Sequence, residues 1–109
     1  MAGTFQVVIT PAAQQDLEDI IDYLADTVSF DSILAVHDAI IEVIENLKVM
    51  PSKHAPVRET YEFVGDYYRR ALAGNYKVIF HVDESTSEVF VIRIMHIKRG
   101  PSFVQGELL

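Results

Sequence analysis

The amino-acid sequence predicts a single α+β domain in which one strand and two helices precede a three-stranded antiparallel meander. Two stretches between residues 11 and 50 repeat apolar side chains every three or four positions, which indicates amphipathic helices. Three later stretches are rich in β-branched and aromatic residues and are separated by short polar turns. A length of 109 residues suits one domain with one core. We expect the order β-α-α-β-β-β over residues 1–109, with the helices on one side of an antiparallel sheet.

The first strand is predicted over residues 4–10, which are β-branched or aromatic at most positions. Pro11 ends it, because proline cannot donate a hydrogen bond to a sheet. Thr10 suits the N-cap of a helix with Pro11 as its first residue. The inward stripe of that helix, about four turns long, comprises Ala13, Leu17, Ile20, Ile21 and Leu24.

Residues 27–31 break the helical pattern, and either Ser29 or Asp31 can cap a second helix that ends before Pro51. The link between the helices is short, so they should lie antiparallel as an α-hairpin. The inward stripe of the second helix is predicted to consist of Ile33, Val36, Ile40, Val43 or Ile44, and Leu47.

Three strands are predicted over residues 67–73, 76–83 and 88–97, with Gly74-Asn75 and a polar tetrapeptide at 84–87 as the turns. Residues 89–97 are apolar at seven of nine positions, which is typical of a strand at the centre of a sheet or covered on both faces. Residues 51–66, with two prolines and mixed charge, are predicted to form a loop.

Composition excludes several classes of site. The chain has no cysteine, so it can form neither a disulfide nor a thiolate metal site. Its four histidines lack zinc-ligand spacing, and no glycine-rich phosphate loop is present, so we expect no metal and no cofactor. No apolar run approaches the roughly 18 to 20 residues that cross a bilayer, and the first residues do not resemble a secretory signal, so we expect no membrane partner and a cytoplasmic protein.

The formal charge of −7 is unevenly distributed along the chain. Residues 1–50 contain nine acids and one base (1 − 9 = −8), whereas residues 51–109 contain seven acids and eight bases (8 − 7 = +1). An acidic surface repels phosphate, so the first half is poorly suited to nucleic acid. The second half could still offer a mildly basic surface.

Several segments together resemble the RelE/ParE toxin superfamily from about residue 5 to residue 104. The sequence TPAAQQDL at 10–17 follows the first strand, DYL occupies 22–24, and LKVMP at 47–51 closes the second helix. The most specific segment is YRRALAGNYKVIFHV at 68–82, which is similar to the family's hairpin rich in arginine, glycine, tyrosine and valine. The strand VIRIMHIKR at 91–99 completes the resemblance.

The resemblance implies the toxin of a type II toxin–antitoxin pair, often described as a plasmid stabilisation protein and inhibited by a cognate antitoxin encoded beside it. RelE-like members cleave mRNA, usually on the ribosome. ParE-like members bind DNA gyrase and block replication. A resemblance in fold cannot choose between these activities, and a degenerate member without toxicity is a third alternative.

Cleavage of RNA through its 2′-hydroxyl requires a base, a cation near the phosphate and an acid. The candidates are Arg70, Lys77, Arg93 and His96, and the structural alternative is that the arginines pair with carboxylates. The resemblance implies a C-terminal tyrosine or histidine on this sheet in the ribonuclease members, and a lysine-rich stretch before the hairpin. In this sequence no tyrosine follows Tyr76, His96 has no assured base partner, and only Lys48 and Lys53 represent the lysine-rich stretch. This departure and the acidic first half favour the gyrase-binding activity, for which the predicted binding surface is Arg70, Lys77, Arg93, His96, Lys98 and Arg99.

Leu34 and Ile41 lie seven residues apart in the second predicted helix and outside its inward stripe. One interpretation is a contact with an antitoxin, with gyrase or with a second copy in a homodimer. The other is that the helix buries a wider apolar face against the sheet. The sequence leaves both open.

Overall fold

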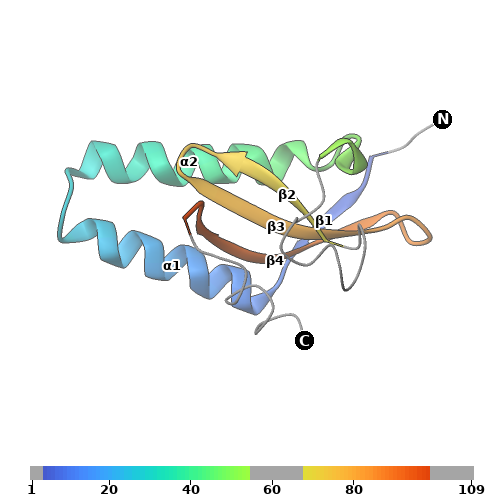
Figure 1. Ribbon diagram of the computed structural model, residues 1–109, viewed down its shortest axis with the longest axis horizontal. Coiled ribbons are helices and arrows are strands. Elements are labelled where there is room, and N and C mark those ends of the chain that lie inside the picture. Colours follow the sequence, from blue (N-terminus) through green and yellow to red (C-terminus); the bar gives the residue numbers. More distant parts are fainter. Residues whose placement is uncertain (1–3, 55–67, 99–109) are drawn as a thin grey trace.

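The computed structural model describes residues 4–54 and 68–98, and its element order is the predicted one (Figure 1). Thr10 caps α1 through its side chain, as predicted, and of the two candidates for the cap of α2 the structure selects Ser29. The second helix ends at Asn46, before Pro51, which instead opens a short 3-10 helix, η1. The elements are β1 (Gln6–Ile9), α1 (Pro11–Ala25), α2 (Phe30–Asn46), η1 (Pro51–Lys53), β2 (Tyr68–Ala73), β3 (Tyr76–Asp83) and β4 (Glu88–His96).

The four strands form one sheet in the order β1-β4-β3-β2. β2, β3 and β4 make the predicted antiparallel meander, but β1 pairs with β4 in parallel, so the sheet is mixed and the expectation of a wholly antiparallel sheet was wrong. A residue pattern indicates that a strand exists, whereas its direction depends on where the intervening helices return the chain. β4 has neighbours on both sides, as its apolar composition predicted.

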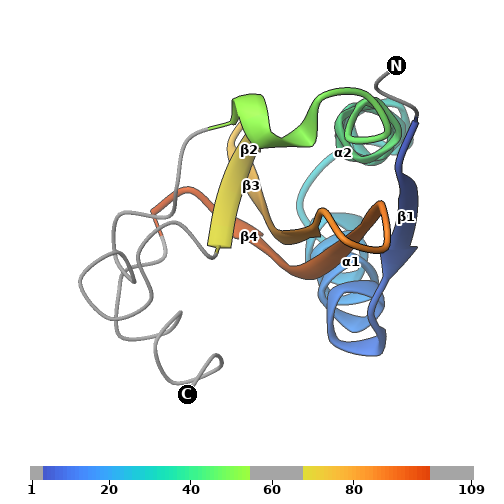
Figure 2. The ribbon, with the colours of Figure 1, turned by 90° about the vertical axis from the view of Figure 1, so that its right-hand side faces the viewer.

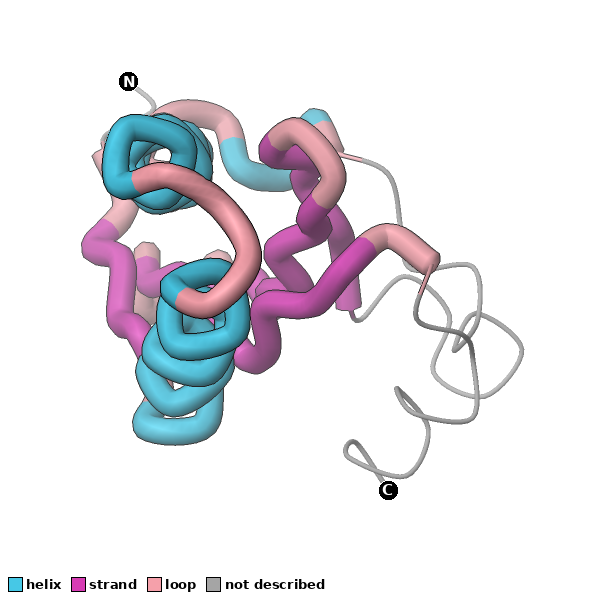
Figure 3. The backbone as a smooth tube through the Cα atoms, turned by 90° about the vertical axis from the view of Figure 1, so that its left-hand side faces the viewer, coloured by secondary structure: helices cyan, strands magenta, loops and turns pink. Residues whose placement is uncertain are grey.

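Both helices pack against the same face of the sheet, α2 over β2 and β3 and α1 along β4 (Figures 1 and 2). Figure 3 shows the antiparallel helices from the end at which a short loop joins them. The predicted inward stripes account for Ala13, Ile40, Ile44 and Leu47 of the core. The main core residues are Ala13, Ile40, Ile44, Leu47, Ala71, Ala73, Val78, Phe80, Val89, Val91 and Ile94.

Thr10 holds the corner where β1 becomes α1. Its hydroxyl accepts a hydrogen bond from the backbone N–H of Ala13 at 3.3 Å and donates one to the carbonyl of Val91 at 2.7 Å. The register between β3 and β4 shifts near this corner. Ile79 lies opposite Arg93, whereas the next residue, Phe80, lies opposite Val91. This bulge bends β4 at the point where its pairing with β1 ends. Beyond that point α1 takes the place of β1 beside β4.

Candidate functional site

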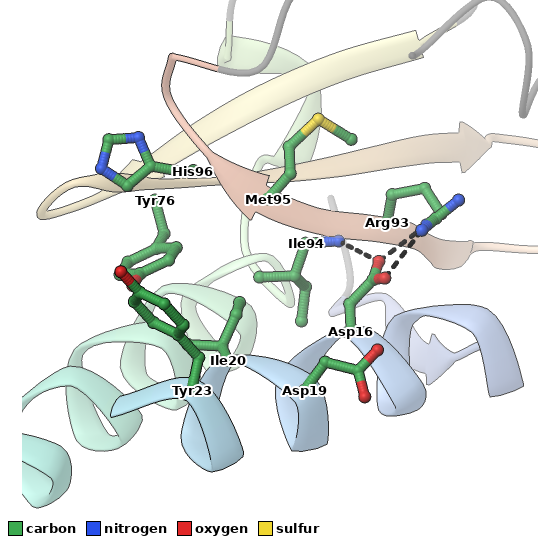
Figure 4. Close-up of a pocket in the computed structure, with 9 residues that line it drawn as sticks. All are labelled: Asp16, Asp19, Ile20, Tyr23, Tyr76, Arg93, Ile94, Met95 and His96. Carbon is green, nitrogen blue, oxygen red and sulfur yellow. Dashed lines mark hydrogen bonds and ion pairs between the residues drawn. The ribbon is translucent and has the colours of Figure 1, made fainter. Parts of the chain in front are cut away.

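A groove of about 530 Å³ lies between α1 and the final residues of β4 (Figure 4). Its residues on α1 are spaced at three and four positions, so they share one helix face. The opposite wall comes from the ends of β3 and β4. The lining residues are Asp16, Asp19, Ile20, Tyr23, Tyr76, Arg93, Ile94, Met95 and His96.

One end of the groove is closed by an ion pair between Asp16 of α1 and Arg93 of β4. The guanidinium donates from Nε to Oδ2 and from Nη2 to Oδ1, both at 2.7 Å, in the bidentate geometry that favours arginine. The backbone N–H of Ile94 donates to the same Oδ2 at 2.8 Å. Asp16 therefore satisfies an N–H on the edge of β4 that β1 leaves open, and both of its oxygens are engaged.

Aromatic rings form the other end of the groove, where Tyr23 and Tyr76 lie next to His96 (Figure 4). Tyr76 and His96 are cross-strand partners whose rings meet edge to face with centroids 5.5 Å apart. The pKa of Tyr76 is raised above its usual value, by burial first and by the neighbouring Tyr23 second. The backbone N–H of Lys98 donates to Nδ1 of His96 at 3.1 Å, which assigns the ring proton of a neutral imidazole to Nε2.

Asp19 lies on α1 between these two ends of the groove. It is exposed, and Oδ1 accepts a hydrogen bond from Nε2 of Gln15 at 2.9 Å. The groove thus contains two carboxylates and one guanidinium, so its formal charge is −1 with His96 neutral. Because Arg93 neutralises Asp16, the negative charge available to a ligand is that of Asp19.

Comparison with known proteins identifies the family. The family model described as "ParE toxin of type II toxin-antitoxin system, parDE" matches residues 7–101. The chain belongs to the ParE toxin family. This ParE-family chain is therefore the toxin of a type II toxin–antitoxin system, within the superfamily that its motifs resemble. No curated protein shows significant similarity to it.

Solved structures share the fold of this ParE-family chain at low sequence identity. A chain of the chromosomal ParDE system from P. aeruginosa superposes with a TM-score of 0.71 at 18% identity, and the match covers 89% of this chain and 100% of that one. A chain of the RelBE2 toxin–antitoxin complex from Mycobacterium tuberculosis has a TM-score of 0.60 at 19% identity, with coverages of 85% and 98%. A chain of the archaeal RelE-RelB complex from Pyrococcus horikoshii has a TM-score of 0.57 at 19% identity, with coverages of 89% and 99%.

The structure gathers three of the predicted cations of the ParE-family chain on the sheet face opposite the helices. Arg70, Ile79 and Arg93 form one cross-strand row, and Lys77 lies in the next row on the same face. These cations are not displayed equally. Lys77 is only 4% exposed, and the guanidinium of Arg93 turns at the sheet edge toward Asp16.

The other predicted binding residues lie elsewhere. His96 pairs with Tyr76 on the helix side of the sheet, so the structure does not bring it together with Arg70 and Lys77. Lys98 is exposed in the turn that follows β4. Arg99 lies outside the described residues.

The predicted partner-contact residues on α2 differ in exposure. Leu34 is 42% exposed, whereas Ile41 is partly buried. Phe30, one turn before Leu34, is 70% exposed and extends the same stripe. The apolar face of α2 is therefore wider than the predicted inward stripe, and its first turns remain open to solvent.

Sequence reasoning missed the groove residues Asp19, Tyr23 and Tyr76. A signal existed, because residues 16, 19, 20 and 23 follow the spacing of one helix face and combine acidic, apolar and aromatic types. Nothing in the sequence shows which strand that face meets. Within residues 4–54 and 68–98, no helix is long and apolar enough to cross a membrane, and no group of three acidic or histidine side chains is placed to hold a metal ion.

Proposed function

We propose that this toxin acts by binding DNA gyrase rather than by cleaving RNA, and that a cognate antitoxin holds it inactive by covering part of the same domain. The observation that carries the proposal is that two of the predicted cations, Arg93 and Lys77, do not present their charges at the surface. Arg93 is engaged by Asp16 through two hydrogen bonds, and Lys77 is 4% exposed. Neither presents its charge to an incoming phosphate in this arrangement.

Ribonuclease chemistry requires a base, an acid and a cation that converge on one scissile phosphate. His96, the candidate acid or base, lies on the helix side of the sheet, whereas Arg70 and Lys77 lie on the other face. A protein that works by binding needs no such convergence. The separation of these side chains therefore favours a protein target.

Charge supports the same preference. Helices α1 and α2 contain eight acidic residues and no lysine or arginine. Binding to RNA on a ribosome relies on contacts between cations and phosphates, and an acidic surface of this extent opposes them. A protein surface with basic patches is a better match.

Partnership with an antitoxin is supported by the matched structures from Mycobacterium tuberculosis and Pyrococcus horikoshii, which are toxin–antitoxin complexes. Two features of the described residues suit such a partner. β2 is the last strand of the sheet, so an extended segment can add to it as a further strand. The exposed stripe at Phe30 and Leu34 suits an amphipathic helix.

The decisive experiment separates a gyrase inhibitor from a ribonuclease. The purified chain is added to bacterial DNA gyrase with relaxed plasmid, and in parallel to a translating bacterial extract whose transcripts are followed by primer extension. We expect inhibition of supercoiling, intact transcripts, and relief of inhibition by the antitoxin.

Variant Arg70→Ala tests the sheet face, and Lys48→Ala is the matched control, because it removes one exposed positive charge from the end of the helical hairpin. We expect inhibition to weaken for Arg70→Ala alone. Cleaved transcripts with normal supercoiling would support the RelE-like activity instead. Normal growth when the chain is expressed without antitoxin would identify a degenerate member.

A further inference from the structure

The groove between α1 and the end of β4 has the chemistry of a receptor for a cationic side chain. We propose that it seats an arginine of the antitoxin, with the guanidinium stacked on Tyr23 and Tyr76 and paired with Asp19. This inference rests on the proposed antitoxin partnership and names one contact within it. It is carried by a cavity, two aromatic rings and one carboxylate.

Asp19 is the carboxylate that remains available in the groove. Asp16 already accepts three hydrogen bonds from Arg93 and Ile94, so a second guanidinium would have to break that arrangement. Asp19 accepts one hydrogen bond, from Gln15, and keeps Oδ2 for a ligand. An ionised carboxylate with a spare oxygen binds a guanidinium through a strong, charge-assisted hydrogen bond.

The tyrosines provide the aromatic faces for a flat cation. Tyr23 is 70% exposed and lies four residues after Asp19 on α1, so their side chains are neighbours on one helix face. Tyr76 stands opposite and is held by its edge-to-face contact with His96. A planar guanidinium stacks on such rings, whereas an ammonium is more strongly hydrated, and for that reason arginine suits the groove better than lysine.

Apolar surface continues from the groove into the junction of the two helices. The exposed side chains Val28 and Phe30 follow Tyr23, in the adjoining loop and at the start of α2. These residues belong to the end of α1, the connecting loop and the start of α2, and Figure 1 shows this junction at one end of the molecule. A basic and partly apolar polypeptide matches this end in both charge and polarity.

The first test uses the isolated toxin and a small probe. N-acetyl-arginine amide is titrated into ¹⁵N-labelled protein, with N-acetyl-citrulline amide as the neutral probe of equal shape and N-acetyl-lysine amide as the ammonium probe. We expect saturable shifts at Tyr23, Tyr76 and His96 with the arginine probe, weaker shifts with lysine and none with citrulline. Equal shifts from citrulline and arginine would overturn the proposal.

The second test measures antitoxin binding to toxin variants. Asp19→Asn keeps the acceptor for Gln15 but removes the charge, and we expect affinity for the antitoxin to fall by about fivefold to tenfold. Asp22→Asn removes the same charge from an exposed site on α1 outside the groove and should leave affinity within about twofold. Tyr23→Ala should weaken binding, whereas Tyr23→Phe, which keeps the ring, should not.

Failure of this inference is distinguishable from failure of the proposed partnership. If the antitoxin binds and neutralises wild-type toxin and Asp19→Asn equally well, the arginine site is wrong and the partnership stands. If no antitoxin binds wild-type toxin, the partnership itself is wrong. A concentration-dependent dimer of the toxin that Asp19→Asn dissociates would assign the groove to a second copy and also overturn the proposal.

Discussion

At the scale of single residues, Asp16 is an acidic side chain with a structural role. It joins α1 to β4 through Arg93 and also closes the open N–H of Ile94. Both ion-pair side chains are largely buried, at 11% exposure for Asp16 and 14% for Arg93. Removing one member of such a pair leaves the other charge without compensation in a poorly solvated place.

We therefore predict that Asp16→Asn lowers the free energy of unfolding by about 2 kcal/mol, because asparagine keeps one acceptor but loses the charge. Urea denaturation monitored by tyrosine fluorescence measures this. Asp22→Asn on the exposed side of α1 is the control and should change stability by less than about 0.5 kcal/mol. A double-mutant cycle with Arg93→Gln that gives additive losses would contradict the coupling.

His54 is predicted to make stability depend on pH. Its pKa is lowered from the ordinary value of 6.5, by burial first and then by the positive charges of Lys53 and Arg69. Its ring also meets Phe80 edge to face at 5.7 Å. Below pH 6.5 the unfolded chain therefore binds more protons than the folded chain. The stability that the neutral form of His54 contributes is present above pH 6.5 and is lost as the pH falls through the folded-state pKa.

The measurement is the melting temperature of the wild-type chain and of His54→Gln between pH 7.5 and pH 5.5. We expect the variant to be less stable at pH 7.5 but to lose less stability on acidification, because it has no group to protonate at this position. The same slope in both proteins would show that His54 does not contribute to the pH dependence.

At the scale of elements, the starts of the helices were predictable because their chemistry is local. Thr10 followed by Pro11 marks the start of α1, and Ser29 was one of two candidate caps, with Asp31, for the start of α2. The Gly74-Asn75 turn is equally local, and Gly74 has a φ of +60°, which glycine adopts without strain. Such features need no knowledge of the rest of the fold.

Relations between distant elements were not predictable in this way. β1 pairs with β4 in parallel, and Asp16 binds at the edge of β4. Both interactions join residues more than 75 positions apart in the sequence. The predicted strands placed Arg70, Lys77 and Arg93 on one sheet, but a bulge in β4 and the turn of Arg93 toward α1 decide which charges are displayed. The sequence prediction placed His96 on one surface with those cations. Closeness in the sequence does not show which face of the sheet a residue at the end of a strand occupies.

The corner between β1 and α1 supplies an element-scale prediction. The hydroxyl of Thr10 both caps α1 and binds the carbonyl of Val91, whereas the hydroxyl of Ser29 caps α2 in an exposed setting. Thr10→Ala should therefore cost about 2 kcal/mol and Ser29→Ala about 1 kcal/mol or less. Urea denaturation of both variants checks the ratio, and equal losses would mean that the bond to Val91 contributes little.

At the scale of the whole molecule, the helical hairpin carries eight acidic residues and no lysine or arginine along its length. The loop that joins α1 to α2 lies at one end of the longest dimension, and the turn between β3 and β4 lies at the other (Figure 1). A field of this kind attracts a basic partner before any contact forms, and it acts mainly on the association rate. A side chain seated in a groove acts mainly on the dissociation rate.

This division predicts how two kinds of variant differ in stopped-flow binding to the antitoxin. Asp22→Asn with Asp31→Asn should slow association severalfold at low salt, flatten its decline with ionic strength and leave dissociation unchanged. Asp19→Asn should instead accelerate dissociation, because it removes the proposed partner of an arginine. Glu84→Gln with Glu88→Gln makes the same charge change at the opposite end and should slow association less, since the β3–β4 turn lies far from the groove. If both double variants slow association equally, net charge and not its placement guides the antitoxin to this toxin.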